Sequence, residues 1–125
     1  MSRLDTVARA CRVAISMEIS PVTTLPPHAI IREVGLRDGL QSISPVLPTD
    51  RKLEWLRDAV AAGQREIEVG SFVPARLMPQ LADTAEVLAY AKTIPNLFAS
   101  VLVPNLKGAQ RALEVDPLAA SRKWR

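Results

Sequence analysis

The sequence predicts an α/β protein in which short strands and helices alternate. Residues 31–35 (Ile-Arg-Glu-Val-Gly) have a close counterpart at residues 66–70 (Glu-Ile-Glu-Val-Gly), and a third apolar run follows at residues 98–103. Each run is short, rich in β-branched residues and bounded by turn residues, which is typical of a buried strand. We therefore expect three parallel strands that are joined by right-handed crossovers.

Helices are expected in the segments that follow the three strands. Thr49 is a candidate N-cap for the first helix, and Gly63 suits its C-terminal end. Residues 83–86 (Asp-Thr-Ala-Glu) have the form of a capping box at the start of the second helix. Asn105 can cap a third helix that runs over residues 106–113. The order of elements is therefore β-α-β-α-β-α.

Two architectures accommodate this order, namely a doubly wound sheet and a (β/α)8 barrel. No Gly-x-Gly-x-x-Gly motif follows the first strand, which lowers the case for a dinucleotide-binding doubly wound sheet. A complete barrel needs roughly 250 residues, and this sequence has 125. We therefore predict the first three βα units of a TIM (β/α)8 barrel, in truncated form. Three units leave unpaired strand edges, so a stable monomer is not expected from them alone.

Composition excludes several classes of function. The net charge is only +3, and no basic stripe with interleaved aromatic residues is present, so nucleic-acid binding is not predicted. No apolar run approaches the length of a membrane span. Cys11 is the single cysteine, which rules out an intrachain disulfide and a thiol-rich metal site. We expect a cytoplasmic protein, since Arg3, Arg9 and Arg12 give only a weak mitochondrial targeting pattern.

Charged residues gather where the predicted strands end. Arg37 and Asp38 follow the first strand, and Glu68 lies in the second. Glu33 and Glu68 occupy the same position of the repeat, so we expect both side chains to face the barrel interior. Buried carboxylates need a cation, which Arg37 or a bound metal would supply, and Asp38 suits Mg²⁺ or Mn²⁺. The alternative is a structural salt bridge that closes a loop.

Three stretches together resemble the hydroxymethylglutaryl-CoA lyase family. They are residues 33–41 (Glu-Val-Gly-Leu-Arg-Asp-Gly-Leu-Gln), residues 67–73 (Ile-Glu-Val-Gly-Ser-Phe-Val) and residues 104–108 (Pro-Asn-Leu-Lys-Gly). The resemblance covers about residues 27–114. Related condensing enzymes of the same barrel superfamily typically carry Glu where this sequence has Leu40, so Leu40 favours the lyase branch.

The resemblance implies a divalent-metal-dependent lyase that cleaves 3-hydroxy-3-methylglutaryl-CoA to acetoacetate and acetyl-CoA. Asp38 matches the metal-binding aspartate, and Arg37 matches the arginine that stabilises enolate charge. Glu68 matches an acidic active-site residue, while Glu33 and Gln41 match polar positions that bind substrate. The partner implied is an acyl-CoA, the metal is Mg²⁺ or Mn²⁺, and the full-length form could be a homo-oligomer.

The sequence also departs from the family pattern. The remaining metal ligands of the family, a His-x-His pair and an Asn, have no counterpart, and neither His28 nor Cys11 replaces a family residue. Val69-Gly70 stands where Ala-Thr is typical. Residues 1–26 are expected to be an irregular extension, and residues 115–125 a tail outside the family pattern.

Three functional hypotheses therefore remain open. The first is a lyase of the hydroxymethylglutaryl-CoA type, inactive as the isolated chain because most ligands are missing. The second is a Claisen-type condensing acyltransferase or another acyl-CoA lyase on the same barrel. The third is a non-catalytic truncated product or an interaction fragment.

Overall fold

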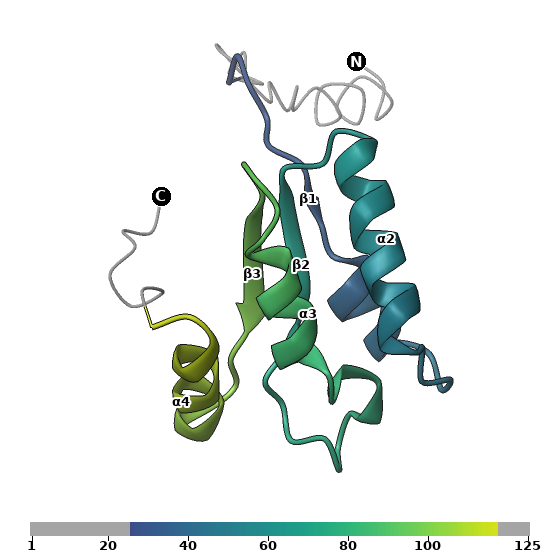
Figure 1. Cartoon of the computed structure of the whole chain (residues 1–125), viewed down its shortest axis with the longest axis vertical. Helices are drawn as coiled ribbons and strands as arrows, with labels where there is room; N and C mark the ends of the chain where they lie inside the picture. The colour runs from purple at the N-terminus through teal and green to yellow at the C-terminus, as the bar shows by residue number, and fades with distance from the viewer. Residues whose placement is uncertain (1–25, 118–125) are drawn as a thin grey trace, which may run out of the picture.

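The computed structural model describes residues 26–117, in which strands and helices alternate as predicted (Figure 1). Each of the three strands is followed by a helix. In chain order these elements are β1 (Arg32–Glu33), α2 (Thr49–Ala61), β2 (Glu66–Ser71), α3 (Thr84–Ala91), β3 (Phe98–Leu102) and α4 (Leu106–Val115). Two short helical turns, η1 (Gly35–Gly39) and η2 (Pro79–Leu81), lie in the connections after β1 and β2.

The three strands form one parallel sheet in the order β1-β2-β3. The central α3 packs on β2 and contacts α2 on one side and α4 on the other (Figure 1). This arrangement confirms the prediction of parallel strands with helical crossovers. Sequential strand order occurs in barrels and also in one half of a doubly wound sheet, so the strand order alone fits both architectures.

The hydrophobic core lies between β2 and the helices. Ile67 and Val69 of β2 are fully buried and form one cluster with Leu56 of α2 and with Val87 and Leu88 of α3. Side chains alternate between the two faces of a strand. The burial of Ile67 and Val69 therefore turns Glu66 and Glu68 toward the opposite face of the sheet.

The end of α2 forms as the sequence predicts, whereas its start does not. Gly63 has a φ of 98°, and its amide donates to the carbonyl of Val60 at 3.0 Å. A positive φ at this position is the usual reason for a glycine after a helix. The predicted N-cap, Thr49, is instead the first helical residue, and Pro48 precedes the helix without a side-chain cap.

The predicted capping box at the start of α3 does not form either. Asp83 does occupy the N-cap position, but its carboxylate makes no capping bond. It accepts from the Lys52 ammonium at 2.5 Å and from the Thr49 hydroxyl at 2.8 Å. Lys52 is almost fully buried and also donates to the carbonyl of Gln80 at 2.6 Å. Asp83 therefore links α2 to the start of α3 instead of capping its own helix.

The predicted cap of the third helix is confirmed. The Asn105 side-chain oxygen accepts from the amide of Gly108 at 2.9 Å, which satisfies one free amide of the first turn of α4. The helix continues to Val115, two residues further than predicted.

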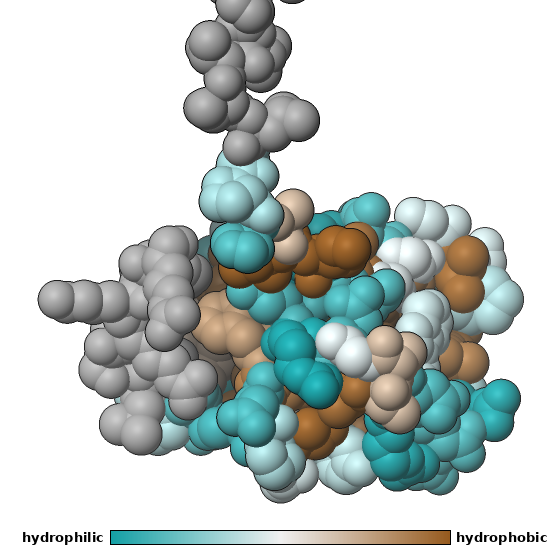
Figure 2. All heavy atoms as spheres, turned by 90° about the horizontal axis from the view of Figure 1, so that it is seen from above, coloured by the Kyte–Doolittle hydropathy of each residue, from teal (hydrophilic) through white to brown (hydrophobic). Residues whose placement is uncertain are grey.

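The first strand is shorter and more exposed than the predicted buried strand over residues 31–35. Only Arg32 and Glu33 pair with β2, while the side chains of Ile30 and Ile31 are 76% and 72% exposed. Figure 2, which looks onto the end of the molecule where the strands begin, shows hydrophobic side chains at the surface there. The side chain of Phe98, the first residue of β3, is also half exposed.

Some predictions concern residues outside the described range. Cys11, the arginines of the first twelve residues and the basic end of the chain are among them. Within residues 26–117, no helix is long and apolar enough to cross a membrane.

We expect Asp83→Ala to lower the free energy of unfolding by about 3 kcal/mol, because it leaves the buried Lys52 ammonium without its carboxylate. Urea denaturation followed by circular dichroism measures this change. Asp58→Ala on the exposed surface of α2 is the matched control, and its effect should stay within about 0.5 kcal/mol. Equal losses in the two variants would contradict the role assigned to the Lys52–Asp83 pair.

Candidate active site

The turn η1 presents two charged residues at the end of β1. The carbonyl of Val34 accepts from the amides of Asp38 at 2.7 Å and Gly39 at 3.5 Å, which makes a wide, π-helical turn. Leu36 and Leu40 anchor this turn in the hydrophobic core. The side chains of Arg37 and Asp38, which lie between these anchors, are left outside the core. Single π-helical turns are frequent at functional sites.

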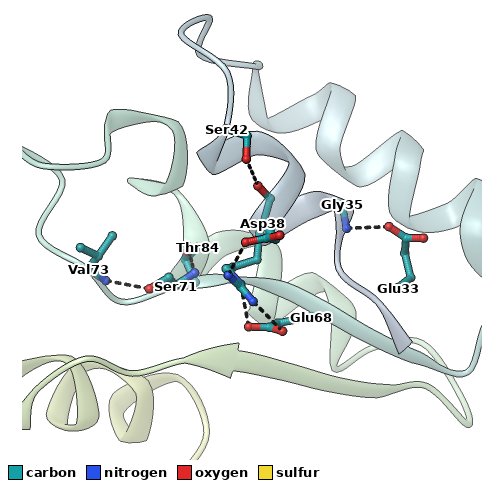
Figure 3. Close-up of polar contacts among 9 residues, drawn as sticks. Glu33, Gly35, Asp38, Ser42, Glu68, Ser71, Val73 and Thr84 are labelled. Carbon is teal, nitrogen blue, oxygen red and sulfur yellow. Dashed lines mark hydrogen bonds and ion pairs between the residues drawn. The ribbon is translucent and has the colours of Figure 1, made fainter. Parts of the chain in front are cut away.

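Arg37 is held on one edge by Glu68 of β2. Its Nε lies 2.8 Å from Oε1 of Glu68, and its Nη2 lies 3.4 Å from Oε2 (Figure 3). The Glu68 side chain is only 12% exposed. The hydrogen bond to Glu68 raises the pKa of Arg37 above its ordinary value, so the guanidinium stays charged. Two parallel contacts of this kind fix the plane of a guanidinium as well as its charge.

Asp38 contacts a different nitrogen of the same guanidinium. Its Oδ1 lies 2.8 Å from Nη1 of Arg37, and its side chain is 59% exposed. The backbone carbonyl of Asp38 accepts from the Ser42 hydroxyl at 2.9 Å, which ties the end of the turn together (Figure 3). The carboxylate of Asp38 is therefore the part of this group that solvent or a ligand can reach.

Glu33 does not share the sheet face of Glu68, so that prediction was wrong. The register pairs Arg32 with Glu66 and Glu33 with Ile67. Glu33 therefore lies on the face of the sheet where Ile67 is buried, whereas Glu68 lies on the opposite face. The Glu33 carboxylate accepts from the amide of Gly35 at 2.6 Å, apart from the Arg37–Glu68 contact (Figure 3). The repeat aligns Glu33 with Glu68, whereas the sheet pairs Glu33 with Ile67, one residue earlier, so the two motifs do not occupy equivalent positions in the sheet.

Gln41, which was predicted to bind substrate, follows the turn η1. The side chain of Gln41 is exposed, and that of Asn105 is engaged as a helix cap. No group of three His, Cys, Asp or Glu residues that could hold a metal occurs within residues 26–117. Asp38, the predicted metal ligand, therefore does not lie in such a group among the described residues.

A close backbone contact beside Glu68 was not predicted. The Thr84 hydroxyl accepts from the amide of Ser71 at 3.1 Å and donates to the carbonyl of Leu81 at 2.7 Å. A Cβ atom at Gly70 would lie 2.4 Å from this hydroxyl oxygen. The register of β2 against β3 shifts between Glu68 and Gly70 at this point. The sequence contains one sign of this contact, because Val69-Gly70 stands where the family typically has Ala-Thr. The glycine at position 70 leaves room for the Thr84 side chain.

Comparisons with known proteins identify the class of fold. No family model matches the chain. A solved hydroxymethylglutaryl-CoA lyase from Pseudomonas aeruginosa superposes with a TM-score of 0.68 at 43% identity, covering 73% of this chain and 30% of that one. A lyase from Acinetobacter baumannii, solved in complex with coenzyme A and 3-methylmalate, gives a TM-score of 0.62 at 39% identity, covering 70% of this chain and 28% of that one. The three βα units therefore match part of the TIM barrel of these lyases.

Curated sequences agree with the structural neighbours. The cytoplasmic 3-hydroxy-3-methylglutaryl-CoA lyase of Rattus norvegicus is 44% identical over 98 residues, which are 78% of this chain and 29% of that protein. The mitochondrial hydroxymethylglutaryl-CoA lyase of Macaca fascicularis is 40% identical, again over 78% of this chain and 30% of that protein. The matched segment thus belongs to the hydroxymethylglutaryl-CoA lyase family, and the chain spans about 30% of the length of these relatives.

We expect Gly70→Ala to destabilise the fold by about 1–3 kcal/mol, because its methyl group would overlap the Thr84 hydroxyl. Thermal unfolding measures the change. Gly39→Ala is the matched control, since a Cβ atom at Gly39 meets nothing within 4 Å. A melting temperature for Gly70→Ala equal to that of Gly39→Ala would contradict the close contact.

Proposed function

We propose that this chain carries the Arg37–Asp38–Glu68 portion of a hydroxymethylglutaryl-CoA lyase active site. One observation supports this proposal above the others. An arginine fixed by a shielded carboxylate of the second strand stands beside an exposed aspartate, just beyond the end of the first strand of a parallel sheet. Active sites of TIM barrels lie at this end of their strands. In this proposal the lyase segment comprises about residues 27–114.

The cleavage proposed for the complete enzyme breaks one carbon–carbon bond of 3-hydroxy-3-methylglutaryl-CoA. The hydroxyl group loses its proton and becomes the ketone of acetoacetate, while the bonding electrons pass to the thioester as an enolate. Protonation of this enolate gives acetyl-CoA. The guanidinium of Arg37 stabilises the negative charge that develops, because it is permanently charged and already oriented by Glu68.

A divalent ion, Mg²⁺ or Mn²⁺, belongs to the same proposal, with Asp38 as one ligand. The exposed carboxylate of Asp38 fits this role by its chemistry and its position. One carboxylate does not complete the octahedral shell that Mg²⁺ requires, and residues 26–117 offer no group of three candidate ligands. The described residues therefore do not fit a complete metal site, and we assign no catalytic step to the metal.

We propose an acyl-CoA as the substrate class and the cytoplasm as the location. The Acinetobacter baumannii relative was solved with coenzyme A bound, and both cytoplasmic and mitochondrial relatives match the chain. A second substrate is favoured by one finding. A Pseudomonas aeruginosa relative, 43% identical over 90 residues, is a lyase for 3-hydroxy-3-isohexenylglutaryl-CoA as well as hydroxymethylglutaryl-CoA.

A chimaera tests the proposal directly. Residues 26–117 would replace the matching segment of the Pseudomonas aeruginosa lyase, and acetyl-CoA release would be measured with both glutaryl-CoA substrates. We expect metal-dependent cleavage, and we expect Arg37→Gln to lower kcat by about 10²–10³-fold because a charge-stabilising donor is lost. Arg51→Gln on the exposed surface of α2 is the matched control. Full activity of the Arg37→Gln chimaera would refute the role of this residue.

The isolated chain of 125 residues is expected to show no metal-dependent cleavage of hydroxymethylglutaryl-CoA. The physical reason is that Asp38 alone binds a divalent ion weakly. The same assay measures this, with the active chimaera as the positive control. Cleavage that requires added Mg²⁺ or Mn²⁺ and disappears in Asp38→Ala would show that this expectation is mistaken.

A further inference from the structure

Ser100 of β3 carries a buried hydroxyl group that no function so far explains. Its oxygen is shielded from solvent and has no hydrogen-bond partner within residues 26–117. Buried hydroxyl groups in folded proteins nearly always have a partner, because an unpaired one costs free energy. An exception therefore calls for a specific reason at this position.

The sheet register brings Ser100 next to Glu68. The two residues are direct partners across β2 and β3, so their side chains project from the same face of the sheet. Neighbouring strands lie about 4.8 Å apart, and a change of side-chain rotamer at Ser100 or Glu68 can bring the hydroxyl and a carboxylate oxygen within hydrogen-bond distance across this gap. Each oxygen of Glu68 accepts one bond from Arg37, and a carboxylate oxygen can accept a second.

We propose that Ser100 is a positioning residue whose hydroxyl group donates to Glu68 and thereby fixes the carboxylate that holds Arg37. This inference rests on the proposed function, since Arg37 matters there as the charge-stabilising group. Asp38 contacts Arg37 only through an exposed carboxylate. If the exposed Asp38 carboxylate turns away from Arg37, Glu68 is the remaining anchor of the guanidinium among the described residues, and a third bond to Glu68 would limit its rotation.

A purely space-filling role for Ser100 predicts the opposite response to Ser100→Ala. If the hydroxyl group never finds a partner, its removal relieves a buried unpaired group and leaves the melting temperature equal or higher. If it donates to Glu68, its removal loosens the carboxylate. The Arg37 side chain then exchanges its Nε proton with solvent faster, because Nε is the atom bound most closely to Glu68.

The experiment uses the full chain and follows exchange of the Arg37 Nε proton by ¹⁵N NMR. We expect Ser100→Ala to accelerate this exchange about tenfold, as expected when a hydrogen bond to a charged group is lost. Ser100→Thr, which keeps the hydroxyl group, should restore the original rate. Ser44→Ala, in an exposed loop, is the matched serine control and should leave the rate unchanged.

An unchanged exchange rate together with an equal or higher melting temperature in Ser100→Ala would overturn the inference. If Ser100→Ala does not fold as the isolated chain, kinetics in the chimaera decide, where a positioning role predicts a lower kcat at unchanged KM, restored by Ser100→Thr. The two proposals fail separately. A chimaera without lyase activity refutes the proposed function, whereas an active chimaera that is insensitive to Ser100→Ala refutes only the role of Ser100.

Discussion

The alternation of side chains along β2 is the constraint on which the other parts of the structure depend. Ile67 and Val69 enter the core, and each contributes roughly 1.5–3 kcal/mol by burial. A shift of one residue would expose both of them and bury Glu68 among apolar side chains. Because β2 pairs with a strand on each side, it also fixes the register of β1 and β3. The place of Glu68, and through it that of Arg37, is therefore decided by the packing of two apolar neighbours.

The parts of the fold that the sequence predicts are those set by short-range chemistry. The three strands follow from short β-branched runs, and the end of α2 follows from the positive φ that Gly63 adopts. Asn105 caps α4 because its acceptor and the amide of Gly108 are only three residues apart. The meeting of Arg37 with Glu68 was also accessible, because Arg37 follows the first strand and Glu68 lies in the neighbouring parallel strand. In each case, the interacting residues are close in the sequence or lie in consecutive βα units of the repeat.

The incorrect predictions have a common physical origin in partners that are distant in the sequence. Asp83 was assigned to its own helix, yet a buried ammonium is a stronger partner for a carboxylate than a backbone amide, and Lys52 supplies one from α2. Glu33 was assigned by its likeness to Glu68, yet the phase of β1 is set by its pairing with β2. Sequence similarity between two motifs does not establish that they have the same register in a sheet.

The two contacts of Arg37 differ in a way that suits two different chemical tasks. Its bonds to Glu68 are shielded, so breaking them would leave a charge poorly solvated. Its bond to Asp38 is exposed, so water or a cation can replace it at little cost. The turn η1 thus presents the guanidinium of Arg37, which Glu68 holds in place, next to the carboxylate of Asp38, which can rotate. In the proposed lyase site these tasks would be the stabilisation of an enolate and the supply of one ligand to a metal, and the unequal burial of Glu68 and Asp38 separates them.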